Sequence, residues 1–149
     1  MSEIRWNCKS FDELTTNELY NILRLRSEIF VVEQQCIFLD MDDKDQQSYH
    51  VAGYVDDQLI AYARILPAGL SFAETSIGRV IAAKAARNSG AGRMLMEKSI
   101  SHAKEIFGNQ PIRIGAQLYL KKFYSSLGFN TVSDVYMEDG IEHIEMLLY

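Results

Sequence analysis

Residues 77–93 read IGRVIAAKAARNSGAGR, which is a β-prone run, then a loop with two glycines, then the start of an amphipathic helix. Gly90 and Gly92 allow a tight turn with exposed backbone amides, and a helix start adds unpaired N–H groups and a positive dipole end. Arg87 and Arg93 add positive charge at the same place. The segment therefore indicates a strand, a loop and a helix that together can bind a phosphate or pyrophosphate.

Two better-known phosphate loops do not fit these residues. No Gly-Lys-Ser or Gly-Lys-Thr ending follows the glycines, and Leu95 stands where the dinucleotide-binding fingerprint needs its third glycine. A tight turn with no ligand is the other interpretation of two glycines before a helix, and these residues alone leave both open.

The periodicity of apolar residues around this segment predicts the rest of the fold. Helical spacing is found at residues 19–30, 92–107 and 120–127. Strands are predicted at residues 6–10, 49–55, 59–66, 75–82, 112–116, 130–136 and 143–148. The order β-α-βββ-α-β-α-ββ places the chain in the α/β (α+β) class, with helices covering a mixed, mostly antiparallel sheet.

Composition limits the class of protein and the classes of partner. The 149 residues are 48% hydrophobic and 23% charged, which predicts one folded domain over residues 1–149 and excludes a disordered tail. Fifteen Lys and Arg against 20 Asp and Glu give a net charge of −5, so nucleic acid and anionic membranes are not expected partners. Two cysteines and no long apolar run predict a cytoplasmic protein with reduced thiols.

Two motifs resemble a known family. Residues 87–92 match Arg/Gln-x-x-Gly-x-Gly/Ala, the pyrophosphate-loop motif of the GNAT superfamily of acyl-CoA-dependent N-acyltransferases. Residues 123–129, FYSSLGF, resemble the Phe-Tyr-x-x-x-Gly-Phe element of that family. Further segments resemble its ElaA-like subgroup: residues 26–34, 40–45 followed by His50, 78–80, 116–117, and 139–141 with His143. The resemblance spans essentially the whole chain and implies a GNAT-like fold.

The resemblance also implies an activity and a coenzyme. The expected reaction is transfer of an acetyl group from acetyl-CoA, as co-substrate, to an amine that attacks directly in a ternary complex. The amides of residues 87–92 would hold the pyrophosphate, the pantetheine arm would lie along residues 80–82, and an N–H near Ile81 or Ala82 would polarise the thioester. The residues expected to bind the coenzyme are Val80, Ile81, Ala82, Arg87, Asn88, Ser89, Gly90, Ala91, Gly92, Gln117 and Tyr124.

Tyr124 matches the general acid of the family. A phenol can protonate the departing thiolate, which needs a proton to leave irreversibly. The other interpretation is that Tyr124 is ordinary helix core, because it lies on the same apolar stripe as Leu120 and Phe123.

The general base is harder to predict. Glu33 and His50 are the candidates, because an alkylammonium must lose a proton before it attacks. Alternatively, Glu33 neutralises the inward-facing Arg26, and His50 and His143 are capping or core residues. The acidic segment at residues 40–45 would attract a cationic amine. The expected acceptor-binding residues are therefore Arg26, Glu33, Asp42 and His50, and no metal is expected.

Other functions and assemblies remain possible at this level. The fold could hold acyl-CoA without turnover, as a sensor or accessory subunit, or it could bind a phosphate group unrelated to coenzyme A. Neither the amine acceptor nor the association of two chains into a homodimer is readable from the sequence.

Overall fold

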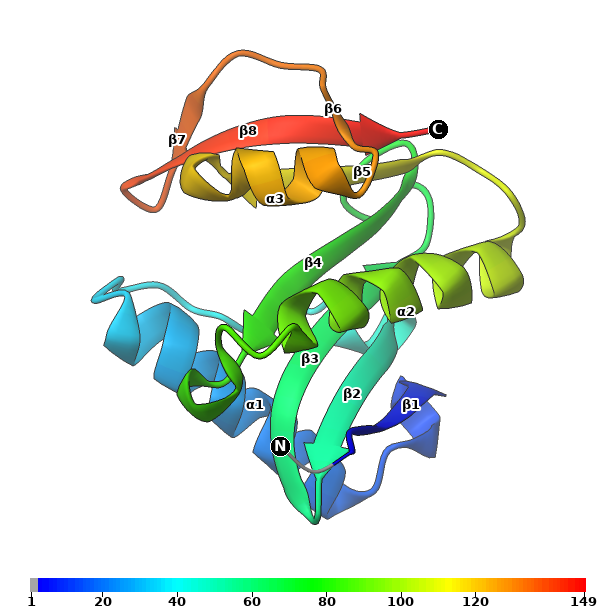
Figure 1. Ribbon diagram of the computed structural model, residues 1–149, viewed down its shortest axis with the longest axis vertical. Coiled ribbons are helices and arrows are strands. Elements are labelled where there is room, and N and C mark those ends of the chain that lie inside the picture. Colours follow the sequence, from blue (N-terminus) through cyan, green and yellow to red (C-terminus); the bar gives the residue numbers. More distant parts are fainter. Residues whose placement is uncertain (1–2) are drawn as a thin grey trace.

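The computed structural model describes residues 3–149 and contains one mixed sheet with helices on both faces (Figure 1). The strands are β1 (Arg5–Ser10), β2 (Tyr49–Val55), β3 (Gln58–Leu66), β4 (Thr75–Ala82), β5 (Ile112–Gln117), β6 (Asn130–Thr131), β7 (Tyr136–Glu138) and β8 (Ile141–Leu148). The longer helices are α1 (Thr16–Arg26), a π-helical segment η2 (Ser27–Glu33), α2 (Ala91–Phe107) and α3 (Lys121–Ser126). Short 3₁₀ turns are η1 (Phe11–Glu13), η3 (Asp45–Gln47), η4 (Lys84–Ala86) and η5 (Leu118–Leu120).

The predicted fold class is confirmed. The strand order is β1-β2-β3-β4-β5-β8-β6, and β7 also pairs with β8. Neighbouring strands are antiparallel except β4 and β5, which are parallel. Figure 1 shows β5, β8 and α3 gathered at one end, β1 to β3 with α1 and α2 at the other, and β4 between them.

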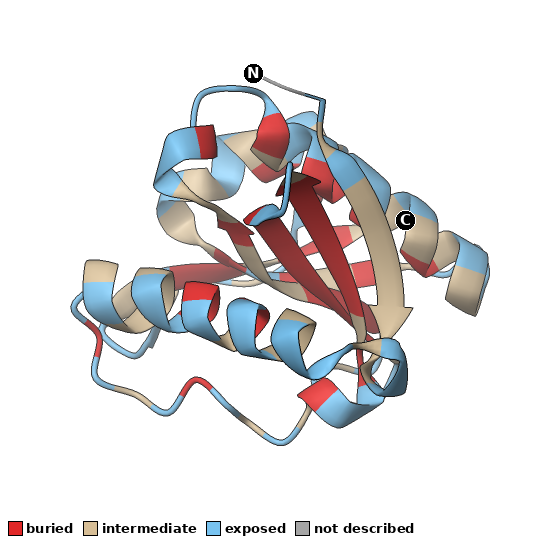
Figure 2. Cartoon of the chain, turned by 90° about the horizontal axis from the view of Figure 1, so that it is seen from below, coloured by how far each residue is buried: buried red, intermediate tan, exposed pale blue. Residues whose placement is uncertain are grey.

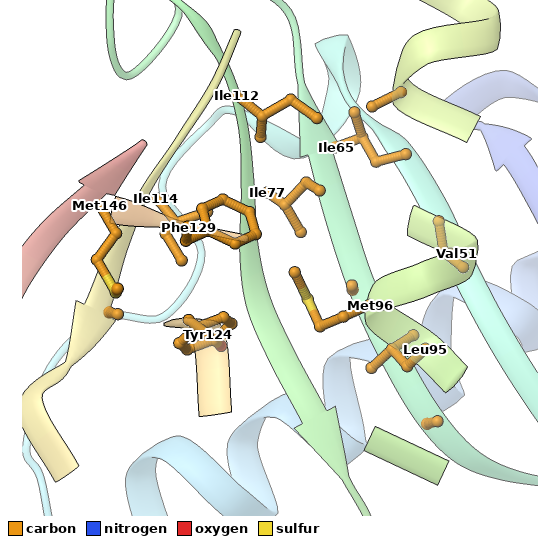
Figure 3. Packing of buried hydrophobic residues seen from close by; sticks show 14 of the residues in the cluster. Val51, Ile65, Ile77, Leu95, Met96, Ile112, Ile114, Tyr124, Phe129 and Met146 are labelled. Atoms are coloured by element: carbon orange, nitrogen blue, oxygen red, sulfur yellow. The ribbon is translucent and has the colours of Figure 1, made fainter. Parts of the chain in front are cut away.

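Apolar side chains hold the helices to the sheet. Ile22 and Leu25 of α1 lie in one buried cluster with Tyr62. On the opposite face, Leu95 and Met96 of α2 belong to a larger cluster with strand residues, as Figure 3 shows. The outer helix surfaces are exposed and the central strands are buried (Figure 2). The apolar residues that recur at helical spacing are therefore buried against the sheet, on one face by α1 and on the other by α2.

The first helix differs from its predicted bounds at both ends. It begins at Thr16, because Thr15 and Glu18 form a capping box in which each side chain accepts a hydrogen bond from the other residue's backbone N–H. It ends at Arg26 and continues as the π-helical segment to Glu33. Such wider turns are common at functional sites, and this one carries Glu33 to the edge of the site described below.

The strand predicted at residues 130–136 is divided into β6 and β7. Between them, the backbone N–H of Glu145 donates to the Ser133 hydroxyl over 2.8 Å, while the N–H of Val132 donates to the Glu145 carbonyl over 3.0 Å. A side-chain oxygen thus replaces a backbone acceptor and interrupts the strand pairing with β8. A tight turn at Asp139-Gly140 joins β7 to β8, and both residues have positive φ.

Candidate functional site

The site begins where β4 and β5 separate. The two strands pair only at Thr75 with Ile112 and at Ser76 with Arg113. Beyond these residues β4 pairs with β3 alone, so its other edge presents backbone N–H and C=O groups without a strand partner. Such an edge can be completed by an extended, amide-containing ligand.

A bulge in β4 lies at the same place. Between the pairs Arg64–Gly78 and Tyr62–Ile81, β4 contains one residue more than β3, and Arg79 has a φ of 49°. Bulges re-aim side chains and are frequent next to functional sites. Here the bulge sends the Arg79 side chain to Asp40, where it donates to the carboxylate over 2.8 Å.

The separated strands leave a cavity of about 1160 Å³. Its walls come from β4, β5, the loop before α2, α3, the π-helical segment and the β7–β8 turn. The segment after the π-helix bridges the gap: the Cys36 thiol donates to the Asp139 carbonyl over 3.2 Å, and Gln117 donates to Gln34 over 3.4 Å. The cavity is therefore bounded by both halves of the sheet.

Most of the residues predicted to bind the coenzyme lie in this cavity. Its lining includes Val80, Ile81, Ala82, Arg87, Asn88, Gly90, Gly92, Gln117 and Tyr124. Ser89 and Ala91 do not line it, because the Ser89 hydroxyl donates back to the Ala86 carbonyl and Ala91 is buried in the core. Their neighbours Asn88, Gly90 and Gly92 do line the cavity, so the segment at residues 87–92 still borders it.

The start of α2 gives the cavity an anion-binding end. Gly90 is the N-cap residue with a φ of 85°, a left-handed conformation that suits glycine, and no side chain caps the helix. Met94 donates to the Gly90 carbonyl and begins the helical hydrogen bonds. The amides of Ala91, Gly92 and Arg93 come before that bond and have no partner within the helix, so they are available to an anion.

Glu33 has a different partner from the predicted one. Its carboxylate accepts hydrogen bonds from Arg87 over 2.7 and 3.1 Å, and Lys84 lies 3.5 Å away. The prediction that Glu33 neutralises Arg26 is therefore wrong. The hydrogen bonds and charge of Arg87 lower the pKa of Glu33, which makes it a weaker base than a free glutamate.

Arg26 is instead neutralised by the acidic segment. Its side chain is fully buried and donates to Asp40 over 2.8 Å and to Asp45 over 2.7 Å. Arg64 donates to Asp45 over 2.9 Å and to Asp42 over 2.7 Å. Burial alone would raise the pKa of Asp45, but its hydrogen bonds to the two arginines lower it.

This network contradicts the acceptor-site prediction for Arg26, and the one for Asp42 stays a prediction. Arg26 does not line the cavity and makes no contact there. Asp42 does line the cavity. Burial alone would raise the pKa of its carboxyl group, but the hydrogen bonds and charge of Arg64 have the larger effect and lower it. Because arginines neutralise three carboxylates of residues 40–45, the segment is a structural clamp rather than a free acidic surface that attracts amines.

The predicted role of His50 as a general base and acceptor-binding residue is also wrong. Its side chain is fully buried, does not line the cavity, and uses both ring nitrogens, with Nδ1 2.6 Å from the Tyr62 hydroxyl and Nε2 3.0 Å from the Asp45 carbonyl. Burial lowers its pKa. A histidine with no open nitrogen cannot take a proton from a substrate, so His50 is a core residue.

Tyr124 lies at the wall of the cavity that α3 forms. Its ring packs edge-on against Phe123 and Phe129, with centroids 5.1 and 6.0 Å away, and only 5% of the residue is exposed. Burial raises its pKa, so the phenol stays protonated at neutral pH. The ring is therefore part of the core, as the second interpretation holds, and the role of Tyr124 as general acid stays a prediction.

Three cavity residues, Arg64, Arg79 and Glu138, had no predicted role, and His143 was predicted only as a capping or core residue. Arg64 and Arg79 order residues 40–45, and Glu138 and His143 line the cavity on the side of β7 and β8. A charged residue inside the apolar run at 59–66 was a signal for Arg64. No local pattern brings Glu138 next to His143, because their proximity depends on the pairing of β7 with β8.

Within residues 3–149, no three His, Cys, Asp or Glu side chains gather where they could hold a metal ion. In the same part of the chain, no helix is both long and apolar enough to cross a membrane.

Comparison with known proteins gives consistent matches over the length of the chain. The profile of the acetyltransferase (GNAT) domain family matches residues 26–149. Protein ElaA of Escherichia coli is 41% identical over 145 residues, which cover 96% of this chain and 95% of that protein. A UPF0039 protein of Synechocystis is 41% identical over 146 residues, covering 97% and 95%.

Solved structures agree with these sequence matches. The crystal structure of Escherichia coli ElaA has a TM-score of 0.93 at 39% identity and covers 99% of this chain and 100% of that one. An acyl-CoA N-acyltransferase from Pseudomonas aeruginosa has a TM-score of 0.94 at 38% identity, with the same coverage. The fold as a whole therefore has counterparts of known structure.

Proposed function

The chain belongs to the acetyltransferase (GNAT) family, and from that membership we propose that it transfers an acetyl group from acetyl-CoA to an amine of a small molecule or peptide. The name of the related Pseudomonas aeruginosa structure, an acyl-CoA N-acyltransferase, supports this class of reaction. The amine attacks the thioester carbon directly while both substrates are bound, so no acyl-enzyme forms.

The observation that carries the proposal is a continuous path of backbone donors. The unpaired edge of β4 runs from Ile77 toward Ala82, and the loop at residues 87–92 continues it to the open amides at the start of α2. An amide-bearing arm that ends in a pyrophosphate matches this path, with the arm along the strand and the anion at the helix. An N–H near Ile81 or Ala82 then polarises the thioester carbonyl.

The net charge of −5 does not oppose a ligand with several phosphates. The binding path uses local backbone dipoles, and Arg87 and Arg93 line the cavity beside them. The two free cysteines, Cys8 and Cys36, support a cytoplasmic location for the reaction.

Two measurements test the proposal. Calorimetry with acetyl-CoA is expected to show binding at one site, and thiol release is expected with at least one member of a panel of primary amines and peptides. Binding without thiol release across the panel would favour the sensor alternative. If acetyl-CoA gives no heat of binding, coenzyme A is excluded as the ligand, and the site would bind a phosphate group of another compound.

Replacement of Gly92 by alanine separates coenzyme binding from folding. Gly92 lines the cavity, and a Cβ built there meets no atom within 4 Å, so an added methyl group occupies space that the ligand needs. We expect Gly92→Ala to weaken acetyl-CoA binding about tenfold, which is roughly 1.4 kcal/mol. Stability should not fall, because alanine is the better helix residue by up to about 1 kcal/mol.

The control is Ser101→Ala, an exposed change on the same helix outside the cavity. It should leave the acetyl-CoA Kd as it is in the wild type. Unchanged binding in Gly92→Ala, measured by the same calorimetry, would contradict a pyrophosphate site at this helix start.

A further inference from the structure

His143 lies in the wall of the cavity in which the proposed acceptor amine would bind. It is in the middle of the sheet half formed by β5, β7 and β8, opposite Gln117 on one side and Tyr136 on the other, and its ring stacks on Tyr136. It lines the same cavity as Tyr124. Its side chain reaches the space between the separated strands but is otherwise enclosed, with 7% of the residue exposed.

The hydrogen bonds of His143 select one tautomer. Nδ1 is 2.8 Å from the Ile141 carbonyl, which can only accept, so Nδ1 carries the proton of the neutral ring. Nε2 is then the nitrogen with the free lone pair. A backbone carbonyl that orients the ring in this way is the usual means of preparing a histidine as a base.

Glu138 supplies the charge that a protonated ring would need. Its carboxylate is 3.4 Å from Nε2, and because a carboxylate donates no hydrogen bond, the contact becomes an ion pair only after Nε2 takes a proton. The carboxylate of Glu138 itself is 60% exposed, so it can move aside for a substrate.

Most of the other charged groups near the ring are already paired. Glu145, two residues along β8, is held by Arg113 of β5 at 2.9 Å. Across the cavity, Asp42 is held by Arg64, and Arg79 by Asp40. Asp139 follows Glu138 in the β7–β8 turn and adds negative charge. The surroundings therefore favour a cation on this side of the cavity.

The earlier candidates lack these properties. Glu33 is tied to Arg87, and His50 has no open nitrogen. We propose that His143 Nε2, oriented by Ile141 and backed by Glu138, takes the proton from the ammonium group of the acceptor. This inference rests on the proposed N-acetyl transfer and assigns the base that such a transfer needs.

The proton balance follows directly. His143 takes one proton from the ammonium group, and the neutral amine forms the C–N bond with the thioester carbon. The C–S bond then breaks, and the thiolate receives a proton from the Tyr124 hydroxyl. The new amide nitrogen loses its second proton, which restores Tyr124, and His143 releases its proton to water.

The pH dependence of His143→Gln tests the proposal. At pH 7 we expect kcat/KM for a primary alkylamine to fall about 100-fold, the lower range of general-base effects. The loss should shrink as the pH approaches the pKa of the amine, because more of the substrate is then already neutral. An aromatic amine, which is neutral at pH 7, should show a much smaller loss.

Two further variants make the result specific. Glu138→Gln changes an exposed side chain and should lower kcat/KM at pH 7 by a smaller factor, with the same recovery at high pH. His102→Gln, on α2 outside the cavity, is the matched control and should resemble the wild type. Calorimetry should give each variant the acetyl-CoA affinity of the wild type, which shows that it folds.

The outcomes distinguish the role of His143 as base from the proposed N-acetyl transfer itself. A loss of equal size at every pH and with both amines would assign His143 to structure, and full activity in His143→Gln would also overturn its role as base. If the wild-type protein releases no thiol with any amine, the proposed function fails, and the base assignment fails with it.

Discussion

Tyr124→Phe is expected to lower kcat about 100-fold or more while acetyl-CoA binding and folding stay as in the wild type. The ring packs against Phe123 and Phe129, and phenylalanine preserves those contacts. Only the hydroxyl is lost, from a residue that lines the cavity. The measurement is single-turnover thiol release at saturating acetyl-CoA, together with urea unfolding.

Burial raises the pKa of Tyr124, which makes it a weaker acid in its free state. The thiolate that leaves during the reaction would form in the same enclosed space, where burial also raises the pKa of a thiol. Proton transfer between the two therefore remains feasible, and a protonated phenol is available at all neutral pH values.

Tyr20→Phe is the matched control, because Tyr20 is 67% exposed on α1 and lies outside the cavity. It should have the activity of the wild type. If Tyr124→Phe also keeps the wild-type rate, Tyr124 is a core residue only, and the thiolate takes its proton from water or from another group.

The fold was predictable because its information is local. The apolar spacing at residues 92–107 and the two apolar runs at 49–55 and 59–66 define elements that the structure reproduces. The loop at residues 87–92 matches a motif of six residues in its expected place between a strand and a helix. The separation of β4 from β5 was not visible in any pattern, since it depends on how far two strands distant in sequence continue to pair.

Ion-pair partners were the least predictable feature. The spacing of α1 showed correctly that Arg26 faces inward, and burial then required a carboxylate. Glu33 was nearer in sequence than Asp40 and Asp45, but it lies at the end of the π-helical segment η2, where it meets Arg87 instead. A local pattern identifies an unpaired buried charge, but only the tertiary structure selects which acidic residue neutralises it.

The substitution Asp45→Asn in the same buried network is expected to have the second large effect, a loss of stability. Asp45 accepts hydrogen bonds from both Arg26 and Arg64 and is 6% exposed, so Asp45→Asn leaves two enclosed guanidinium groups short of one negative charge. We expect a loss of about 3 kcal/mol in the free energy of unfolding, since breaking a buried ion pair costs roughly 3–5 kcal/mol. Urea unfolding at pH 7 measures it.

Asp43→Asn is the control, because Asp43 is exposed in the same segment and its φ of 62° suits asparagine equally well.

Acidification should remove the same stabilisation, because it protonates the Asp45 carboxylate. The folded-state pKa of Asp45 lies below its unfolded value, so its stabilisation is complete above about pH 5 and is lost as the pH falls through the folded pKa. The wild type should thus lose more stability than Asp45→Asn on acidification, and the two should converge. If Asp45→Asn at pH 7 is as stable as Asp43→Asn, the arginines do not depend on Asp45, and Asp40 and Asp42 neutralise them alone.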